Sequence, residues 1–181
     1  KRQQNRIYEG NRGMINWMYF PQNKKMEKHL LDIVDVFSSY QSIIDSTRHN
    51  KKSDDVLSII SEKLEEKGYS VEKSKNKKDK IRVPVLFGKN GNISLAFEVD
   101  AYSVEYQTVI EVEAGRAVAN YQFLKDFYEA CMMPNVKYCC IAVRNIYRNC
   151  NDFEKVCSFF QTLYISNKFQ LPLNGILIIG Y

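Results

Sequence analysis

Apolar side chains recur along this chain with two periods, and the change of period separates helices from strands. A spacing of three to four residues predicts helices over 26–49, 53–67, 116–133 and 151–167. Alternating or continuous apolar runs predict strands over 69–72, 80–87, 95–100, 108–113, 137–143 and 175–179. Residues 1–25 show neither period, and we expect an irregular or partly helical arm pinned to the body by Trp17, Tyr19 and Phe20.

Proline and glycine refine the middle of this pattern. Pro84 lies inside an apolar run, which predicts an edge strand or a bulge because proline cannot donate to a ladder. The stretch 88–91 is Gly-Lys-Asn-Gly, a sequence typical of a hairpin turn. Gly68 and Gly115 mark the ends of a helix and a strand.

The predicted order is helix, three meandering strands, helix, strand, helix, strand. A strand–helix–strand crossover follows 108–113, so we expect a mixed sheet flanked by helices, in an α/β (α+β) fold. No internal repeat or linker is visible. The 181 residues therefore predict one domain, in which an N-terminal arm and helix (1–52) precede a core (53–181).

Positive charge is modest in total but clustered. The net charge is +5, and Lys73 to Lys80 holds five lysines in eight residues. Basic clusters suit a polyanion that is held through its phosphates, which makes Lys75, Lys77 and Lys78 candidate nucleic-acid contacts. The alternative is a loop that only keeps the protein in solution.

The cysteines and the hydropathy bear on the setting. Five cysteines without Cys-x-x-Cys pairs indicate reduced, mostly buried thiols and a cytoplasmic protein. No apolar run reaches the roughly 20 residues that span a bilayer, and no signal peptide is visible. We expect no membrane association.

Acidic residues alternate with apolar ones in two neighbouring predicted strands. Period two places Glu98 and Asp100 on one face of the first strand, and Glu111 and Glu113 on one face of the second. A hairpin that aligns Asp100 with Glu111 also aligns Glu98 with Glu113. Directly opposed like charges destabilise a sheet, whereas an all-oxygen set suits Mg²⁺, Mn²⁺ or Ca²⁺. The pattern predicts a metal site.

The place of these acids in the order of elements resembles the PD-(D/E)XK nuclease superfamily over residues 56–143. Asp100 matches the first acid of that motif and Glu111 the second, while Glu113 stands where most members carry lysine. No proline precedes Asp100, which departs from the motif. The Glu-x-Glu form looks like restriction endonucleases of the BamHI and BglII type. The resemblance implies a restriction-endonuclease-like core.

The resemblance also implies roles for individual residues. Asp100, Glu111 and the carbonyl of Val112 would hold Mg²⁺ or Mn²⁺, and Glu113 would bind the metal or accept the proton of the attacking water. Further candidates lie on the flanking helices: Lys125 for the missing lysine, Glu62 as a helix acid that binds metal, and Arg116 and Asn120 for phosphate or base contacts. Glu98 remains a candidate for an outer position around the metal.

The activity that follows is Mg²⁺-dependent hydrolysis of DNA phosphodiester bonds, restriction-type, with duplex DNA cut by a homodimer. One alternative is a catalytically silent nuclease fold that only binds nucleic acid. Another is a nuclease for RNA or for branched or damaged DNA. A third is an interaction domain whose acidic hairpin faces solvent.

Overall fold

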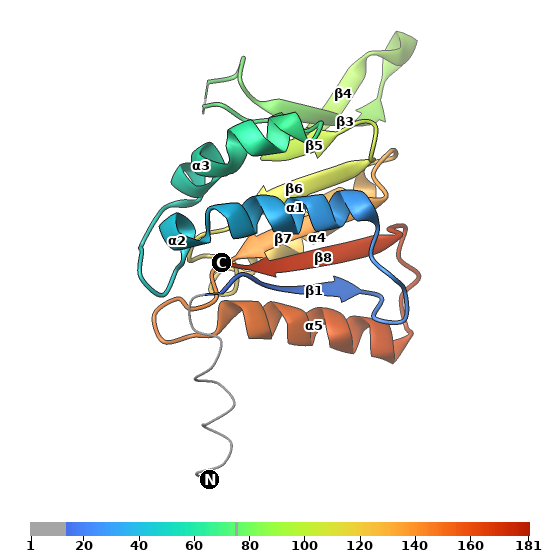
Figure 1. Ribbon diagram of the computed structural model, residues 1–181. Coiled ribbons are helices and arrows are strands. Elements are labelled where there is room, and N and C mark those ends of the chain that lie inside the picture. Colours follow the sequence, from blue (N-terminus) through green and yellow to red (C-terminus); the bar gives the residue numbers. More distant parts are fainter. Residues whose placement is uncertain (1–13, 75) are drawn as a thin grey trace.

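The computed structural model describes residues 14–74 and 76–181, which form a central sheet between two layers of helices (Figure 1). The sheet has six strands in the order β1-β8-β7-β6-β5-β2, and β3 and β4 form a separate two-stranded sheet. The strands are β1 (Asn16–Phe20), β2 (Ser70–Val71), β3 (Ile81–Phe87), β4 (Ile93–Val99), β5 (Ala101–Ser103), β6 (Thr108–Val112), β7 (Tyr138–Val143) and β8 (Gly175–Gly180).

Strand direction confirms the predicted mixed sheet. β6, β7 and β8 run parallel in the centre, while β1, β5 and β2 join antiparallel at the two sides. The continuous apolar sequence of β7 reflects this position, since a central parallel strand is covered on both faces. The predicted restriction-endonuclease-like order of elements is confirmed with it.

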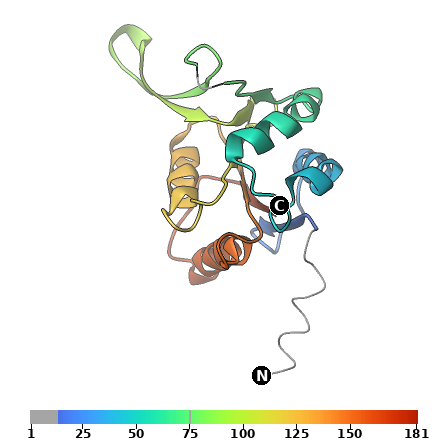
Figure 2. The ribbon, with the colours of Figure 1, turned by 90° about the vertical axis from the view of Figure 1, so that its left-hand side faces the viewer.

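Helices cover both faces of the sheet (Figure 2). One face packs against α1 (Lys28–Ser39), α2 (Gln41–Ile44) and α3 (Ser53–Glu66), in a core that contains Phe37, Ile60 and Ile110. The other face packs against α4 (Gln122–Met132) and α5 (Asp152–Ser166), around Phe127 and Phe160. Alternate residues of β6 therefore face different helices: Ile110 faces α1 and α3, and Val109 faces α4 and α5.

The N-terminal segment corrects the sequence prediction. Residues 16–20 form a strand that pairs antiparallel with β8 along its whole length, where an irregular or partly helical arm was predicted. Tyr19 and Phe20 are buried as expected, but Trp17 is 44% exposed and does not pin the segment. The first 13 residues of the predicted arm lie outside the described residues.

Two predicted helices are shorter than expected. The first divides into α1 and α2 at Tyr40, which leaves the helical conformation (φ −111°, ψ 9°), and α2 ends before Asp45 (φ −48°, ψ 111°). α4 begins at Gln122 rather than at 116, because Gly115 (φ 92°) and Tyr121 (φ 53°) are left-handed. A β-carbon at Gly115 would lie 2.6 Å from the ring of Tyr147, so only glycine fits there.

The β3–β4 hairpin extends from the body of the molecule beside the sheet (Figure 1). Its turn lies at residues 88–91 as predicted, with a short 3₁₀ helix η2 (Lys89–Gly91). The register shifts between Pro84 and Leu86, which confirms the bulge. After β4 the chain bends at Asp100 and enters the main sheet as β5. That bend places the acidic residues.

Candidate functional site

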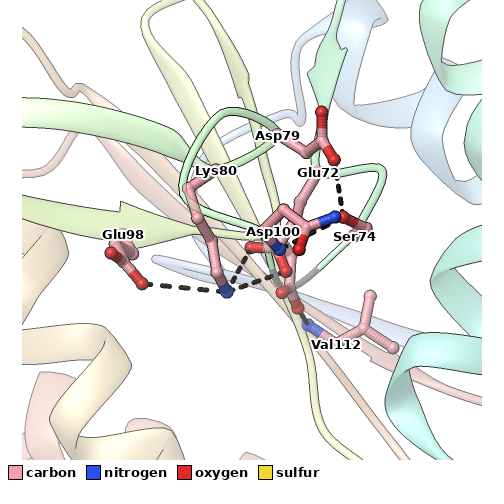
Figure 3. Close-up of polar contacts among 8 residues, drawn as sticks. Glu72, Ser74, Asp79, Lys80, Glu98, Asp100 and Val112 are labelled. Atoms are coloured by element: carbon pink, nitrogen blue, oxygen red, sulfur yellow. Dashed lines mark hydrogen bonds and ion pairs between the residues drawn. The ribbon is translucent and has the colours of Figure 1, made fainter.

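Asp100 lies at the bend between the hairpin and the sheet. The β5–β6 ladder pairs Ala101 with Ile110, so alignment of Asp100 with Glu111 is the next step of the same register, as predicted. The carboxylate of Asp100 accepts a hydrogen bond from the backbone N–H of Val112 at 2.7 Å (Figure 3). At this end of the β5–β6 ladder, a side-chain carboxylate rather than a backbone carbonyl accepts the hydrogen bond. Burial raises the pKa of Asp100 to about 6, although this hydrogen bond opposes the shift.

Glu111 and Glu113 share with Val109 the face of β6 that packs toward α4 and α5. Burial raises the pKa of Glu111 well above its ordinary value, and the charges of Asp100, Asp126 and Glu113 raise it further. Burial also raises the pKa of Glu113 to about 8, with further contributions from Asp126 and Asp100. Negative charges from β6, α4 and the bend therefore meet in one desolvated place.

Asp126 of α4 completes this acid cluster, which we define as Asp100, Glu111, Glu113 and Asp126. Its side chain is 4% exposed, and burial raises its pKa to about 7. One carboxylate oxygen accepts from Nε2 of Gln122 at 3.2 Å, and the other has no hydrogen-bond partner among the described residues. A buried carboxylate oxygen without a partner is costly, and a cation would satisfy it.

The chemistry of the cluster fits a hard divalent cation, since its donors are carboxylate oxygens. As the side chains stand, no group of three or more His, Cys, Asp or Glu residues in the described part of the chain could hold a metal ion. Metal binding would therefore require side-chain rotation that brings the oxygens together.

Glu98 lies outside the acid cluster, and the expected four-carboxylate patch with Glu98 opposite Glu113 is wrong. Glu98 pairs with Arg82 in the hairpin, because the bend at Asp100 sends the two halves of the predicted strand into different sheets. Its carboxylate is exposed and lies 3.7 Å from the ammonium of Lys80. The sequence prediction assumed one straight strand through this region.

Two lysines lie beside the acids. Lys80 contacts both carboxylate oxygens of Glu72, at 2.8 and 2.9 Å (Figure 3), and its positive charge lowers the pKa of Asp100. Lys125, the predicted substitute for the motif lysine, contacts Glu129 at 3.3 Å. Its charge lowers the pKa of both Glu111 and Glu113, which places it next to the acid cluster.

The predicted helix acid Glu62 is exposed on α3. Among the α3 acids, it is Asp54 whose charge raises the pKa of Asp100. Asp54 precedes Glu62 by eight residues, about 12 Å along a helix. The first turn of α3, rather than its last turns, thus approaches the acids.

The predicted nucleic-acid contacts fall into separate groups. Arg116 follows the acid triplet and lines a hollow of about 1040 Å³, and its charge lowers the pKa of Glu113. Asn120 is exposed, and its N–H donates to the carbonyl of Arg116 at 3.1 Å. Lys77 and Lys78 are exposed in the loop before β3, and Lys75 lies outside the described residues.

Sequence reasoning missed Asp126, Glu72 and Asp54. The signal for Asp126 was readable: it follows Phe123 by three residues and precedes Phe127 and Ala130 on the same apolar helix face. Glu72 directly follows β2, and its N–H donates to the carbonyl of Asp100 at 2.8 Å. Nothing local distinguished Glu72 or Asp54 from a solvated acid, since both depend on long-range proximity to Asp100.

Most of the cysteines are buried, as predicted. All five cysteines are free thiols, and Cys139, Cys140 and Cys157 are buried. Among residues 14–74 and 76–181, no helix combines the length and the apolar character needed to cross a membrane.

A mixed sheet flanked by helices, with acids gathered around the end of β6, is compatible with a restriction-endonuclease-like core. The model of a family described as "Putative halobacteria restriction endonuclease" matches residues 4–181, and the chain belongs to this family. No curated protein and no solved structure matches the chain. Family membership indicates a nuclease whose substrate is nucleic acid.

Proposed function

We propose that this protein is a Mg²⁺- or Mn²⁺-dependent endonuclease of the PD-(D/E)XK type that hydrolyses phosphodiester bonds of duplex DNA. The observation that carries the proposal is the acid cluster, in which burial raises the pKa values of all four carboxyl groups and repulsion by other members raises those of Glu111, Glu113 and Asp126 further. Such an arrangement destabilises the metal-free protein, and it fits a site at which a bound cation offsets the negative charges.

The proposed roles follow from position. Asp100 and Glu111 hold the cation, with Asp126 and the carbonyl of Val112 as further oxygen donors. A bound Mg²⁺ or Mn²⁺ would supply Lewis-acid polarisation of the phosphate and a lower pKa for water. Glu113, half-buried at the end of β6, accepts the proton of the attacking water.

In this proposal, α4 supplies the positive charge that faces the reacting phosphate. Lys125 acts electrostatically on Glu111 and Glu113, and we propose that its ammonium balances the phosphate in place of the motif lysine. Lys80 has its ammonium between the carboxylates of Glu72 and Glu98. Its role in this proposal is to hold the Asp100 bend.

Cleavage of supercoiled plasmid tests the proposed function. The purified protein is incubated with plasmid or with single-stranded RNA in Mg²⁺, in Mn²⁺ or in EDTA, beside Asp100→Ala. We expect nicked and linear plasmid with either metal, and no product with EDTA or with the variant. Linear product at a rate that rises with the square of protein concentration would support the proposed homodimer.

The silent nucleic-acid-binding module is the second candidate. Glu113 in the lysine position favours it, as does the absence of a ready metal geometry among the described residues. Retention of plasmid in a gel without cutting in any metal would select this candidate over the nuclease. Cutting that persists in EDTA or in Asp100→Ala would contradict the proposed nuclease site.

A further inference from the structure

A large polar hollow opens beside the acid cluster, at the end of the sheet where β6 and β7 finish. Its volume is about 1040 Å³, which is at the upper end of the usual range for small-molecule pockets. Five basic side chains line it, and Asp54 is the acid among its lining residues. The five come from three distant parts of the chain: Arg48, Lys52, Arg116, Arg144 and Arg148.

Arg144 is fixed at the base of this hollow. Only 6% of the residue is exposed, and its guanidinium donates to Oδ1 of Asn50 at 2.7 Å and to the carbonyl of Lys51. Its Nε has no hydrogen-bond partner among the described residues. A buried guanidinium with a free N–H keeps a donor available for an anion, because arginine in proteins stays charged, although its charge also lowers the pKa of the buried Asp152.

Arg148 is held at the rim by a tight turn. Arg148 and Asn149 are both left-handed (φ 47° and 64°), and Tyr147 and Cys150 exchange two backbone hydrogen bonds of 2.8 Å across them. This is the geometry of a two-residue hairpin turn. The guanidinium groups of Arg144 and Arg148 each lie 5.2 Å from the ring centre of Tyr147, so the same ring contacts both.

The hollow adjoins the acid cluster, since Ala114, the residue after Glu113, is among its lining residues. Arg116 lines the hollow, and its charge lowers the pKa of Glu113. Asp54 also lines the hollow, and its charge raises the pKa of Asp100. Gly115, packed under Tyr147, is the residue that turns the chain from one to the other. If the phosphate that is cleaved lies at the acid cluster, the neighbouring phosphates of the same strand would lie among the arginines of the hollow.

We propose that this hollow binds the phosphates of a nucleic-acid strand adjacent to the reacting one, with Arg116 and Arg148 as direct contacts and Arg144 as the buried anchor. The assignment of nucleic acid as the ligand rests on the proposed function. Planar guanidinium groups pair with phosphate oxygens in a bidentate manner, and their spread over three segments fits several phosphates better than one small anion.

The test is equilibrium binding measured in EDTA, so that cutting plays no part. Fluorescence anisotropy is recorded with a labelled 20-base-pair duplex between about 50 and 200 mM salt. The variant Arg116→Gln with Arg148→Gln is compared with Lys24→Gln with Lys168→Gln. The control removes the same charge from two exposed lysines that line a separate hollow of about 640 Å³ beside α5. Melting curves establish that both variants fold.

The arginine variant is expected to raise the Kd at least about tenfold and to reduce the slope of log K against log salt by about 2. The lysine control should leave both values near those of the wild type. Equal losses in the two variants, or no loss in the arginine variant, would overturn the proposal. Duplexes with 5′-phosphate and 5′-hydroxyl ends should bind equally if internal phosphates fill the hollow, whereas tighter binding of the phosphorylated end would identify a terminal phosphate.

Failure of this proposal is distinguishable from failure of the proposed function. If the wild type cuts and the arginine variant binds DNA as the wild type does, the phosphate-binding role of the hollow is contradicted and the nuclease proposal stands. If the wild type never cuts and the arginine variant loses binding, the phosphate-binding role is supported and the nuclease proposal is contradicted.

Discussion

Glu111→Gln is expected to lose cutting by about 10³-fold or more while it makes the metal-free protein more stable. The loss follows because a barrier higher by about 4 kcal/mol slows a reaction about 10³-fold, and a metal contributes several kcal/mol to phosphate cleavage. The gain in stability follows because Glu111 is desolvated among the charges of Asp100, Asp126 and Glu113. Glutamine has the same shape without the charge.

The size of that gain should depend on pH. Keeping Glu111 protonated in the folded state costs more as the pH rises, so the advantage of glutamine should be larger at pH 8 than at pH 5. We expect a rise in Tm of at least about 3 °C at pH 8, from about 1 kcal/mol. Glu105→Gln, in the exposed turn before β6, is the matched control and should change neither activity nor Tm. A destabilised Glu111→Gln, or one that still cuts, would contradict this expectation.

Without metal, the wild-type protein is expected to lose stability as the pH rises through the range 6 to 8. Asp100, Asp126 and Glu113 have folded-state pKa values of about 6, 7 and 8, above their ordinary values near 4. Between these limits the folded state binds more protons than the unfolded state, so the free energy of unfolding falls with rising pH. The stabilising effect of protonation is complete below about pH 4 and is lost as the pH passes these raised values.

Thermal melting in EDTA across this range measures the effect. We expect Tm to fall by about 5 °C or more between pH 6 and pH 8.5, which corresponds to about 2 kcal/mol. Millimolar Mn²⁺ should flatten the curve, because a cation replaces the protons. A Tm that stays level or rises over this range in EDTA would show that the carboxyl groups are not strained as described.

Local pattern predicted much of the fold because the relevant signals are local. α3 and α5 match their predicted ranges to within a residue, since an amphipathic stripe with a defined end needs no partner to be recognised. β7 was legible from its unbroken apolar run. β1 was missed because its strand conformation depends on pairing with β8, which lies about 160 residues away.

The site residues that follow the period-two pattern of a strand could be predicted from the sequence. Those that only the folded chain brings together could not. Period two along β6 places Glu111 and Glu113 on one face, as expected, and the register with Asp100 also holds. The same rule failed for Glu98, because period two cannot reveal the bend at Asp100. The arginine hollow depends on segments 48–54, 114–116 and 144–149, which only the folded chain brings together.

Direct binding of Mn²⁺ tests the central claim, that the acid cluster is a divalent-cation site, most directly. Calorimetric titration at pH 7.5 in two buffers of different ionisation enthalpy measures the affinity and the protons released. Wild type and Glu105→Gln are expected to bind at least one Mn²⁺ per chain with release of protons, because carboxyl groups with raised pKa values must ionise to become ligands. Glu111→Gln should lose this binding. Absence of binding in the wild type at millimolar Mn²⁺, or equal binding in Glu111→Gln, would contradict the assignment of the acid cluster as a metal centre.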